Sequence, residues 1–292
     1  MARRRPPTVH GMCIVDKPSG MTSHDVVGLL RRRFGERQIG HAGTLDPDAT
    51  GVLVIAVGMA TRLLQFATAT SKRYTGEVVL GTSTSTLDAS GEVTGVFDMV
   101  HVTEDDVRRV VAESLTGEIE QVPPMVSAIR VNGRRLHELA RDGIEVDRKP
   151  RPVTVHEFSI GEISESGVIQ IAVTCSPGTY IRTLAADLGE LLGGGAHLRG
   201  LRRVASGLWT EHDAKGLDEC ELLPVERMVD GLTRVDVDNT TVPKIGQGAV
   251  LPTWDTPHPW AVFADDTLVA VYEPFRDGTA KPIVVLPTAL NR

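Results

Sequence analysis

Val52 to Val57 is an unbroken run of six apolar residues, and it restricts the fold of this chain more than any other segment. A short apolar run that follows turn-forming residues is consistent with a β-strand buried in the core. The loop just before it, Gly40 to Gly51, holds three glycines, a proline, a histidine and two carboxylates. We therefore expect a buried strand that begins directly after a loop of polar, potentially reactive side chains.

The rest of the pattern mixes helices and strands. Thr22 and Ser23 are suitable caps for a helix that ends at Gly35, and Thr103 with Asp106 resembles a capping box. Since strands and helices do not alternate strictly, we expect an α+β fold with a mixed, largely antiparallel sheet flanked by helices. Further strands are expected at residues 12–15, 74–80, 153–160 and 168–174, and amphipathic helices at 103–117 and 179–192.

The composition changes after about Met228. The chain becomes rich in proline, and short β-like runs replace helix signals at residues 261–263, 268–272 and 283–286. A length of 292 residues is enough for one large domain and one small domain. We expect a main domain at residues 1–231 and a small β-rich domain at residues 232–292.

The formal net charge is −7, which by itself argues mildly against a nucleic acid partner. Arginine is nevertheless clustered before residue 210, and its planar guanidinium suits recognition of phosphate. The alternative for any single cluster is a solvated helix face. The clusters are Arg3-Arg4-Arg5, Arg31-Arg32-Arg33 with Arg37, Arg130 with Arg134-Arg135, Arg148-Lys149 with Arg151, and Arg199 with Arg202-Arg203.

The cysteines Cys13, Cys175 and Cys220 are odd in number and widely spaced, which fits a reducing compartment rather than a disulfide framework or a zinc site. No apolar run is long enough for a membrane span, and the basic N-terminus lacks the apolar stretch of a signal peptide. A cytoplasmic protein without a metal or other cofactor is expected. The sequence also lacks the glycine-rich motifs of nucleotide-binding sites.

The loop Gly40-His41-Ala42-Gly43-Thr44-Leu45-Asp46-Pro47-Asp48-Ala49-Thr50-Gly51 resembles the catalytic loop of the TruB family of transfer RNA pseudouridine synthases. Without that resemblance, an Asx-type turn that only stabilises the loop would be the simpler interpretation. Further matching segments occur in order over roughly residues 10 to 210. They are Asp16-Lys17-Pro18, Gly20-Met21-Thr22-Ser23, Lys72-Arg73-Tyr74, Pro123-Pro124-Met125, Ser127-Ala128, Gly133 with Leu136, Ala140-Arg141 with Gly143, Gly178-Thr179-Tyr180-Ile181-Arg182-Thr183-Leu184, Gly195-Ala196-His197-Leu198 and Leu201-Arg202-Arg203.

The resemblance implies that Asp46 is the catalytic carboxylate and that Arg182 is its charge partner. A carboxylate in a dry pocket needs a nearby cation, because burial otherwise raises its pKa and neutralises it. By the same resemblance, Tyr74 stacks on the target base and serves as a proton acceptor, and Tyr180 lines the pocket. The ordinary alternatives are a packed strand tyrosine for Tyr74 and a surface helix arginine for Arg182.

A base inside folded RNA must be flipped out before it can react. The resemblance places His41 against the RNA at the displaced base and Leu201 in the pocket. It also implies that residues of about 123–152 form an insertion that closes over RNA, and that the C-terminal domain is PUA-like, although Asp and Glu outnumber Lys and Arg there. The remaining candidate RNA contacts are Lys17, Arg141, Arg202 and Arg203.

The function implied is the isomerisation of uridine to pseudouridine at position 55 in the T loop of tRNA, by a monomer that needs no guide RNA. Three alternatives stay open at this point. The same chemistry can act on another RNA under the direction of a guide RNA, or the chain can be an RNA-binding factor whose catalysis is incidental. A glycoside hydrolase that uses Asp46 and Asp48 is the third, although two carboxylates so close in sequence seldom flank a bond.

Overall fold

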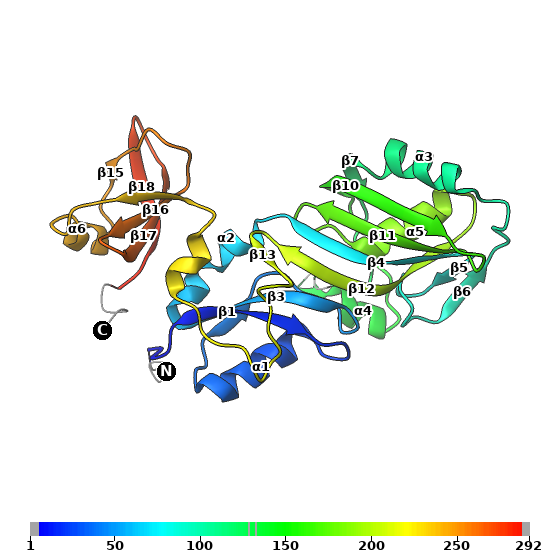
Figure 1. The fold of residues 1–292 in the computed structure, drawn as a ribbon, viewed down its shortest axis with the longest axis horizontal. Helices are drawn as coiled ribbons and strands as arrows, with labels where there is room; N and C mark the ends of the chain where they lie inside the picture. The colour runs from blue at the N-terminus through cyan, green and yellow to red at the C-terminus, as the bar shows by residue number, and fades with distance from the viewer. Residues whose placement is uncertain (1–5, 128, 132, 288–292) are drawn as a thin grey trace.

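The computed structural model describes residues 6–127, 129–131 and 133–287. A large mixed sheet forms the body of the molecule, and a five-stranded sheet of C-terminal residues lies at one end of it (Figure 1). The expected α+β fold with a small β-rich C-terminal part is therefore confirmed. None of the helices in the described ranges is long and apolar enough to cross a membrane.

The large sheet is largely antiparallel, as expected. Its strands are β1 (Gly11–Lys17), β2 (Ile39–His41), β3 (Thr50–Val57), β4 (Lys72–Leu80), β7 (Gly117–Gln121), β10 (Arg151–Ile163), β11 (Val168–Cys175), β12 (Ala196–Ser206) and β13 (Trp209–Thr210). The order across the sheet is β1-β3-β12-β4-β11-β10-β7, with β2 beside β3 and β13 beside β12. β12 runs parallel to β3, and the other neighbours in this order pair antiparallel.

Helix boundaries follow the capping signals of the sequence. The helices are α1 (Ser23–Phe34), α2 (Leu64–Thr68), α3 (Glu104–Ser114), α4 (Leu136–Arg141), α5 (Ile181–Leu191) and α6 (Val242–Gly246), with 3-10 turns η1 (Gly58–Leu63) and η2 (Val225–Val229). Thr22 accepts a hydrogen bond from the Asp25 amide, and the Asp25 carboxylate accepts one from the Thr22 amide. This capping box recurs before α3, and a left-handed Gly35 ends α1.

The Val52–Val57 part of β3 is uniformly apolar because both faces of the strand are buried there. Leu53 and Ile55 pack with Val26 of α1 on one face. Val52 and Val54 face the opposite way, into a cluster that includes residues of the C-terminal sheet. Successive strand residues point to opposite faces, so a strand covered on both sides carries no polar position. The predicted burial of this run is confirmed.

The C-terminal sheet shares apolar packing with the large sheet. Its strands are β14 (Thr233–Asp236), β15 (Leu251–Pro252), β16 (Trp260–Ala264), β17 (Thr267–Pro274) and β18 (Thr279–Val285), in the order β14-β16-β17-β18-β15. Phe263 and Val271 belong to one cluster with Met12 of β1 and Met228 of η2. Apolar side chains of the two sheets therefore pack together in one cluster.

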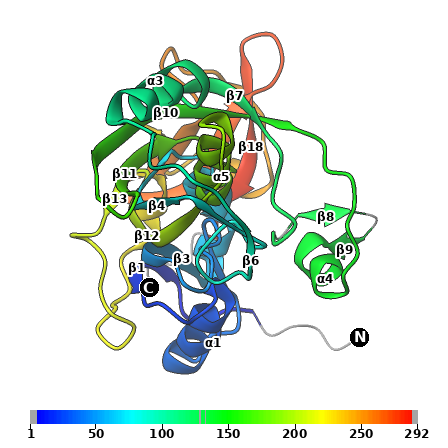
Figure 2. The same cartoon turned by 90° about the vertical axis from the view of Figure 1, so that its right-hand side faces the viewer.

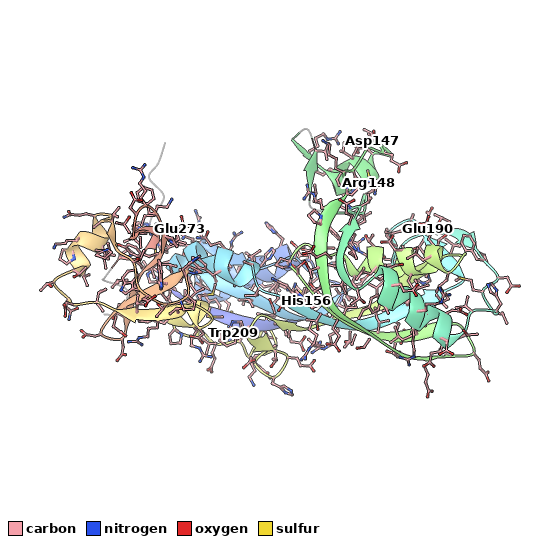
Figure 3. The ribbon with its side chains drawn as sticks, turned by 90° about the horizontal axis from the view of Figure 1, so that it is seen from above. Asp147, Arg148, His156, Glu190, Trp209 and Glu273 are labelled. Atoms are coloured by element: carbon pink, nitrogen blue, oxygen red, sulfur yellow. The ribbon has the colours of Figure 1, made fainter. Side chains whose placement is uncertain are left out.

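An arm projects from the body between β7 and β10. It contains the strand pair β8 (Arg130–Val131) and β9 (Arg134–Arg135) followed by α4, and it stands apart from the sheet in Figure 2. Figure 3 shows Asp147 and Arg148 on this projection, well outside the body. The arm therefore occupies the place of the insertion expected at about residues 123–152.

Several elements were not predicted from the sequence, among them β7, β12 and the hairpin of β5 (Thr82–Thr84) and β6 (Val93–Val96). β12 was missed because its sequence, with three arginines and a glycine, lacks the alternation of a half-buried strand. β12 matters most, since it lies between β3 and β4 and carries Leu201, Arg202 and Arg203.

Candidate active site

The loop that holds Asp46 connects β2 to β3, and buried polar side chains hydrogen-bond to its backbone. Ser23, at the start of α1, accepts a hydrogen bond from the Leu45 amide at 2.9 Å and donates to the Leu45 carbonyl at 3.3 Å. The ammonium of Lys17 donates to the Pro47 carbonyl at 2.9 Å, and Arg203 donates to the Gly43 carbonyl at 3.2 Å. Buried contacts of this kind give the loop a single backbone conformation.

Gly51 closes the loop at a point where two backbones meet. Its φ of 101° is disfavoured for other residues, and a Cβ atom there would lie 2.2 Å from the Arg203 carbonyl oxygen. Gly51 faces Arg203 across the parallel β3–β12 contact. The glycine at the end of the sequence motif is therefore required by the approach of β12.

Asp46 and Arg182 form a bidentate ion pair. Nε of Arg182 lies 2.9 Å from Oδ2 of Asp46, and Nη2 lies 3.0 Å from Oδ1. The arginine side chain is 3% exposed, whereas the aspartate side chain is 38% exposed. A buried, fork-shaped cation thus holds a carboxylate that still faces open space, which is the geometry of a preorganised anion.

Asp88 is a second carboxylate on the same guanidinium, and the sequence analysis did not identify it. Its Oδ2 lies 3.6 Å from Nε of Arg182, and its Oδ1 accepts hydrogen bonds from Thr86 and Ser90. Arg182 also donates to the carbonyls of Thr86 and Val126. The string Thr86-Leu87-Asp88-Ala89-Ser90 reads as an ordinary polar turn, so the only local signal was the turn itself.

The surroundings act on the pKa of Asp46 in opposite directions. Burial raises the pKa above its ordinary value, the Arg182 guanidinium opposes that shift, and Asp88 adds to it. The net direction is upward. Arg182 therefore limits the rise that burial would otherwise cause in a site with two neighbouring carboxylates.

A cavity of about 260 Å³ opens next to this ion pair. Tyr74 of β4 and Tyr180 line it, together with Leu201 and the buried Lys72. Burial raises the pKa of Tyr74, so its phenol is neutral near pH 7, and burial lowers the pKa of Lys72 to about 8. The cavity thus combines aromatic walls with a few polar groups, which suits a flat polar ring.

Leu201 reaches the cavity because β12 is irregular there. The pairing of β12 with β4 shifts register between Arg199 and Arg202, and the left-handed Gly200 lies within the shift. Such bulges redirect a side chain out of the regular alternation. Leu201, Asp46 and Arg182 also line an adjoining cavity of about 430 Å³, so they form a wall between the two.

Two comparisons of the sequence define the family. Residues 31–181 match the TruB family pseudouridylate synthase N-terminal domain, and residues 182–225 match the tRNA pseudouridylate synthase B C-terminal domain. A protein named tRNA pseudouridine synthase B from Bacillus cytotoxicus is 43% identical over an alignment that covers 95% of this chain and 97% of that protein. One of the same name from an Arthrobacter species is 45% identical, covering 94% of this chain and 96% of that protein.

The chain belongs to the TruB family of pseudouridylate synthases.

Solved structures agree with this assignment. The chain resembles the protein in a "Cbf5-Nop10-Gar1 Complex" with a TM-score of 0.72 and 27% identity, over 95% of this chain and 84% of that chain. It resembles one in the "Structure of H/ACA RNP bound to a substrate RNA containing 2'-deoxyuridine" with a TM-score of 0.70 and 25% identity, over 96% and 86%. The TruB assignment predicted from the motifs is confirmed.

Among the RNA contacts expected from the TruB resemblance, Lys17 and Arg203 are buried. Lys17 donates to the carbonyls of Pro18, Met21 and Pro47, and Arg203 donates to those of Val52 and Gly43. Their exposed fractions are 0% and 1%. Two of these carbonyls, those of Pro47 and Gly43, belong to the Asp46 loop, so both side chains support the loop, and a contact of Lys17 or Arg203 with RNA stays a prediction.

The other expected contacts of this TruB protein lie nearer the surface. Arg202 forms ion pairs with Asp16 and Glu211, and Arg141 is exposed at the end of α4 in the arm. His41 ends β2 and lies 6.4 Å, centroid to centroid, from the ring of His24. Burial lowers the pKa of His41, which favours a neutral imidazole. The cluster Arg3-Arg4-Arg5 lies outside the described residues.

Among the residues that the structure describes, no three His, Cys, Asp or Glu side chains are grouped so that they could hold a metal ion.

Proposed function

We propose that this TruB protein isomerises uridine to pseudouridine at position 55 in the T loop of tRNA, with Asp46 as the catalytic carboxylate. The observation that carries the proposal is the bidentate Asp46–Arg182 pair at the edge of a cavity of about 260 Å³ that Tyr74 lines. Relatives that match almost the whole chain are named tRNA pseudouridine synthase B, which supports tRNA as the substrate.

The reaction is a rearrangement within one nucleotide. The bond from C1′ to N1 of uracil breaks, the base turns, and C1′ bonds to C5. The proton leaves C5 and N1 gains one, so the atoms balance without water or an oxidant. Asp46 either attacks the sugar or the base, or it stabilises positive charge on the sugar. Each of these routes requires an ionised carboxylate.

Arg182 meets that requirement in this proposal. Its guanidinium lowers the pKa of Asp46 and so favours the ionised carboxylate against the effect of burial. The bidentate contact also fixes both carboxylate oxygens, which leaves the carboxylate in one orientation toward the cavity. Asp88 and the backbone carbonyls on Arg182 hold the cation in turn.

The target base must leave the RNA stack to reach this cavity. In the proposed complex, uracil lies against Tyr74 with Leu201 on the cavity wall, and His41 lies where the displaced base was. Tyr74 is a candidate proton acceptor. A neutral His41 suits this place, since it can stack on bases without a desolvated charge.

We further propose a division of the chain into a catalytic domain at residues 1–231, with an RNA-closing arm at about 123–152, and a PUA-like domain at 232–292. Arg141 on the arm is an exposed candidate for phosphate contact. Arg202 would need to exchange one of its carboxylate partners for phosphate. We also propose that the protein is a cytoplasmic monomer and acts without guide RNA. The higher identity to the tRNA pseudouridine synthase B relatives than to the H/ACA protein supports the absence of a guide.

The decisive experiment is incubation with an unmodified tRNA transcript, without added cofactor, followed by base-specific chemistry and primer extension. Pseudouridine at position 55, lost in Asp46→Asn and retained in Asp48→Asn, is the expected result. Asp48 is a matched control because it is an exposed aspartate of the same loop. Equal loss in both variants would favour a two-carboxylate mechanism instead.

A folded protein that binds the transcript but forms no product would contradict the proposal. A product that appears only with a guide RNA would shift the assignment to a guided enzyme. A binding factor would keep its biological effect in the Asp46→Asn variant, so complementation of a strain lacking the activity separates that alternative.

A further inference from the structure

Gln121 is a buried polar residue that no part of the mechanism has used. It is the last residue of β7, directly before the arm, and it is 2% exposed. Its Oε1 accepts a hydrogen bond from the Tyr180 amide at 2.7 Å, and its Nε2 donates to the Tyr180 carbonyl at 3.1 Å. One side-chain amide therefore holds both backbone polar groups of one residue, 59 positions away in the chain.

Tyr180 is the N-cap of α5, the residue directly before the helix. Its carbonyl also accepts the first hydrogen bond of the helix, from the Leu184 amide at 3.1 Å. Within the described part of the chain, Tyr180 has no side-chain hydrogen bond that caps this helix. Polar backbone groups at the start of a helix need partners from outside the helix. Here the side chain of Gln121 binds the amide and the carbonyl of the N-cap residue Tyr180 and so holds it in place.

Tyr180 and Arg182, at the start of α5, both belong to the candidate active site. The Tyr180 ring lines the cavity, and Arg182 is in the first turn of α5. Arg182 also donates to the carbonyl of Val126, which lies five residues after Gln121. The chain between β7 and the arm thus contacts the start of α5 at two places.

We propose that Gln121 is a positioning residue for the reaction, which sets the place of Tyr180 and Arg182 against the cavity. The expected effect on the reaction rate rests on the proposed function, whereas the expected effect on the position of Tyr180 does not. Gln121 touches neither the cavity nor the reacting atoms, so it acts through Tyr180 and the first turn of α5. Small displacements of a positioned group reduce rates strongly, since the reacting geometry is narrow.

The chemistry of the side chain makes glutamine specific here. A primary amide presents a donor and an acceptor together, and these match the carbonyl and amide of Tyr180. Methionine has a similar length but replaces neither hydrogen bond. An ionised glutamate keeps the acceptor and loses the donor, whereas a protonated glutamate offers both again.

The first test compares Gln121→Met with wild type in single-turnover pseudouridine formation, with tRNA binding measured separately. Gln170→Met is the matched control, because Gln170 is an exposed glutamine on β11. We expect the rate to fall roughly 10- to 100-fold in Gln121→Met, with tRNA affinity nearly unchanged. An unchanged rate, or a loss confined to tRNA affinity, would overturn the inference.

The second test uses Gln121→Glu and does not depend on Gln121→Met folding well. Burial raises the pKa of a glutamate at this position, so the proton returns as the pH falls. We expect the rate of Gln121→Glu, divided by that of wild type, to rise between about pH 8 and about pH 6. A ratio that stays level or falls overturns the inference, even if the variant is slow.

The third test needs no activity. The chain has three tyrosines, so labelling with 3-fluorotyrosine places fluorine on Tyr74, Tyr180 and Tyr272 alone. The Tyr180 fluorine signal should move in Gln121→Met and Gln121→Glu, while that of Tyr272, in the C-terminal sheet, stays in place. A slow enzyme with an unmoved Tyr180 signal overturns the inference. Wild type without product would count against the proposed function only, and the fluorine signals would still test the role of Gln121.

Discussion

Nε of Arg182 lies 2.9 Å from Oδ2 of Asp46 and 3.6 Å from Oδ2 of Asp88, so one buried guanidinium holds two carboxylates. The two anions differ in their surroundings. Asp88 is bound by Thr86 and Ser90, whereas Asp46 also lines the cavity. In the proposed mechanism Asp46 is the carboxylate that reacts, and Asp88 helps to hold the cation.

Arg182→Lys should lower the single-turnover rate at least about 100-fold, although the charge is kept. An ammonium cannot reproduce the bidentate contact with Asp46 or reach the carbonyls of Thr86 and Val126 at the same time. Rapid quench of labelled tRNA, with binding measured on filters, checks the result. Wild-type activity in Arg182→Lys would show that charge alone is sufficient.

The pH at which the rate is half maximal should shift in opposite directions in two variants. The proposed mechanism needs ionised Asp46, so the rate falls as the pH drops through its raised pKa. Arg182 lowers that pKa and Asp88 raises it. Arg182→Met should therefore move the midpoint to higher pH and Asp88→Asn to lower pH, as pH–rate profiles under single turnover would show. Shifts in the same direction would contradict this electrostatic account.

Gly51→Ala should destabilise the fold far more than Gly20→Ala. Both glycines have positive φ, at 101° and 80°, so both substitutions carry a backbone penalty of about 1–2 kcal/mol. At Gly51 the added Cβ also meets the Arg203 carbonyl oxygen at 2.2 Å, while no described atom lies within 4 Å at Gly20. Urea denaturation of the two variants gives the comparison, and equal losses of unfolding free energy would contradict it.

Lys17→Met should lower the free energy of unfolding by about 2–4 kcal/mol, because the carbonyls of Pro18, Met21 and Pro47 would lose the Lys17 ammonium, while that of Pro47 keeps the Gly20 amide. One of them, Pro47, follows Asp46, so activity should fall as well. Lys215→Met is the control, since Lys215 is exposed. Urea denaturation and tRNA assays check both effects. A stable but inactive Lys17→Met would instead indicate a direct role in the chemistry.

The two sheets should unfold together, because Met228 packs with Met12 of β1 and Phe263 of β16 in one cluster. Met228→Ala should lower the stability of both sheets by about 2–5 kcal/mol. Tryptophan fluorescence can follow each sheet, with Trp209→Phe leaving Trp254 and Trp260 as reporters of the C-terminal sheet. Two separate transitions in urea would show that the sheets are independent.

Local sequence determined the elements whose signals lie within a few residues of one another. The capping box at Thr22, the end of α1 at Gly35 and the buried run of β3 were predicted and confirmed. The TruB motifs singled out Asp46 and Arg182, and the structure places them in contact. Caps and periodicity act over one or two turns, so they can be read directly from the chain.

Only the tertiary structure decided which polar residues line the candidate active site and which hold the lining residues in place. Arg203 looks like any other surface arginine in the sequence, yet β12 lies between β3 and β4 and buries it beneath the Asp46 loop. Asp88 became recognisable only through its contact with Arg182 of α5, and Gln121 only through its contact with Tyr180, 59 residues further along the chain. Such roles depend on strand order and long-range packing, and these leave no local pattern in the sequence.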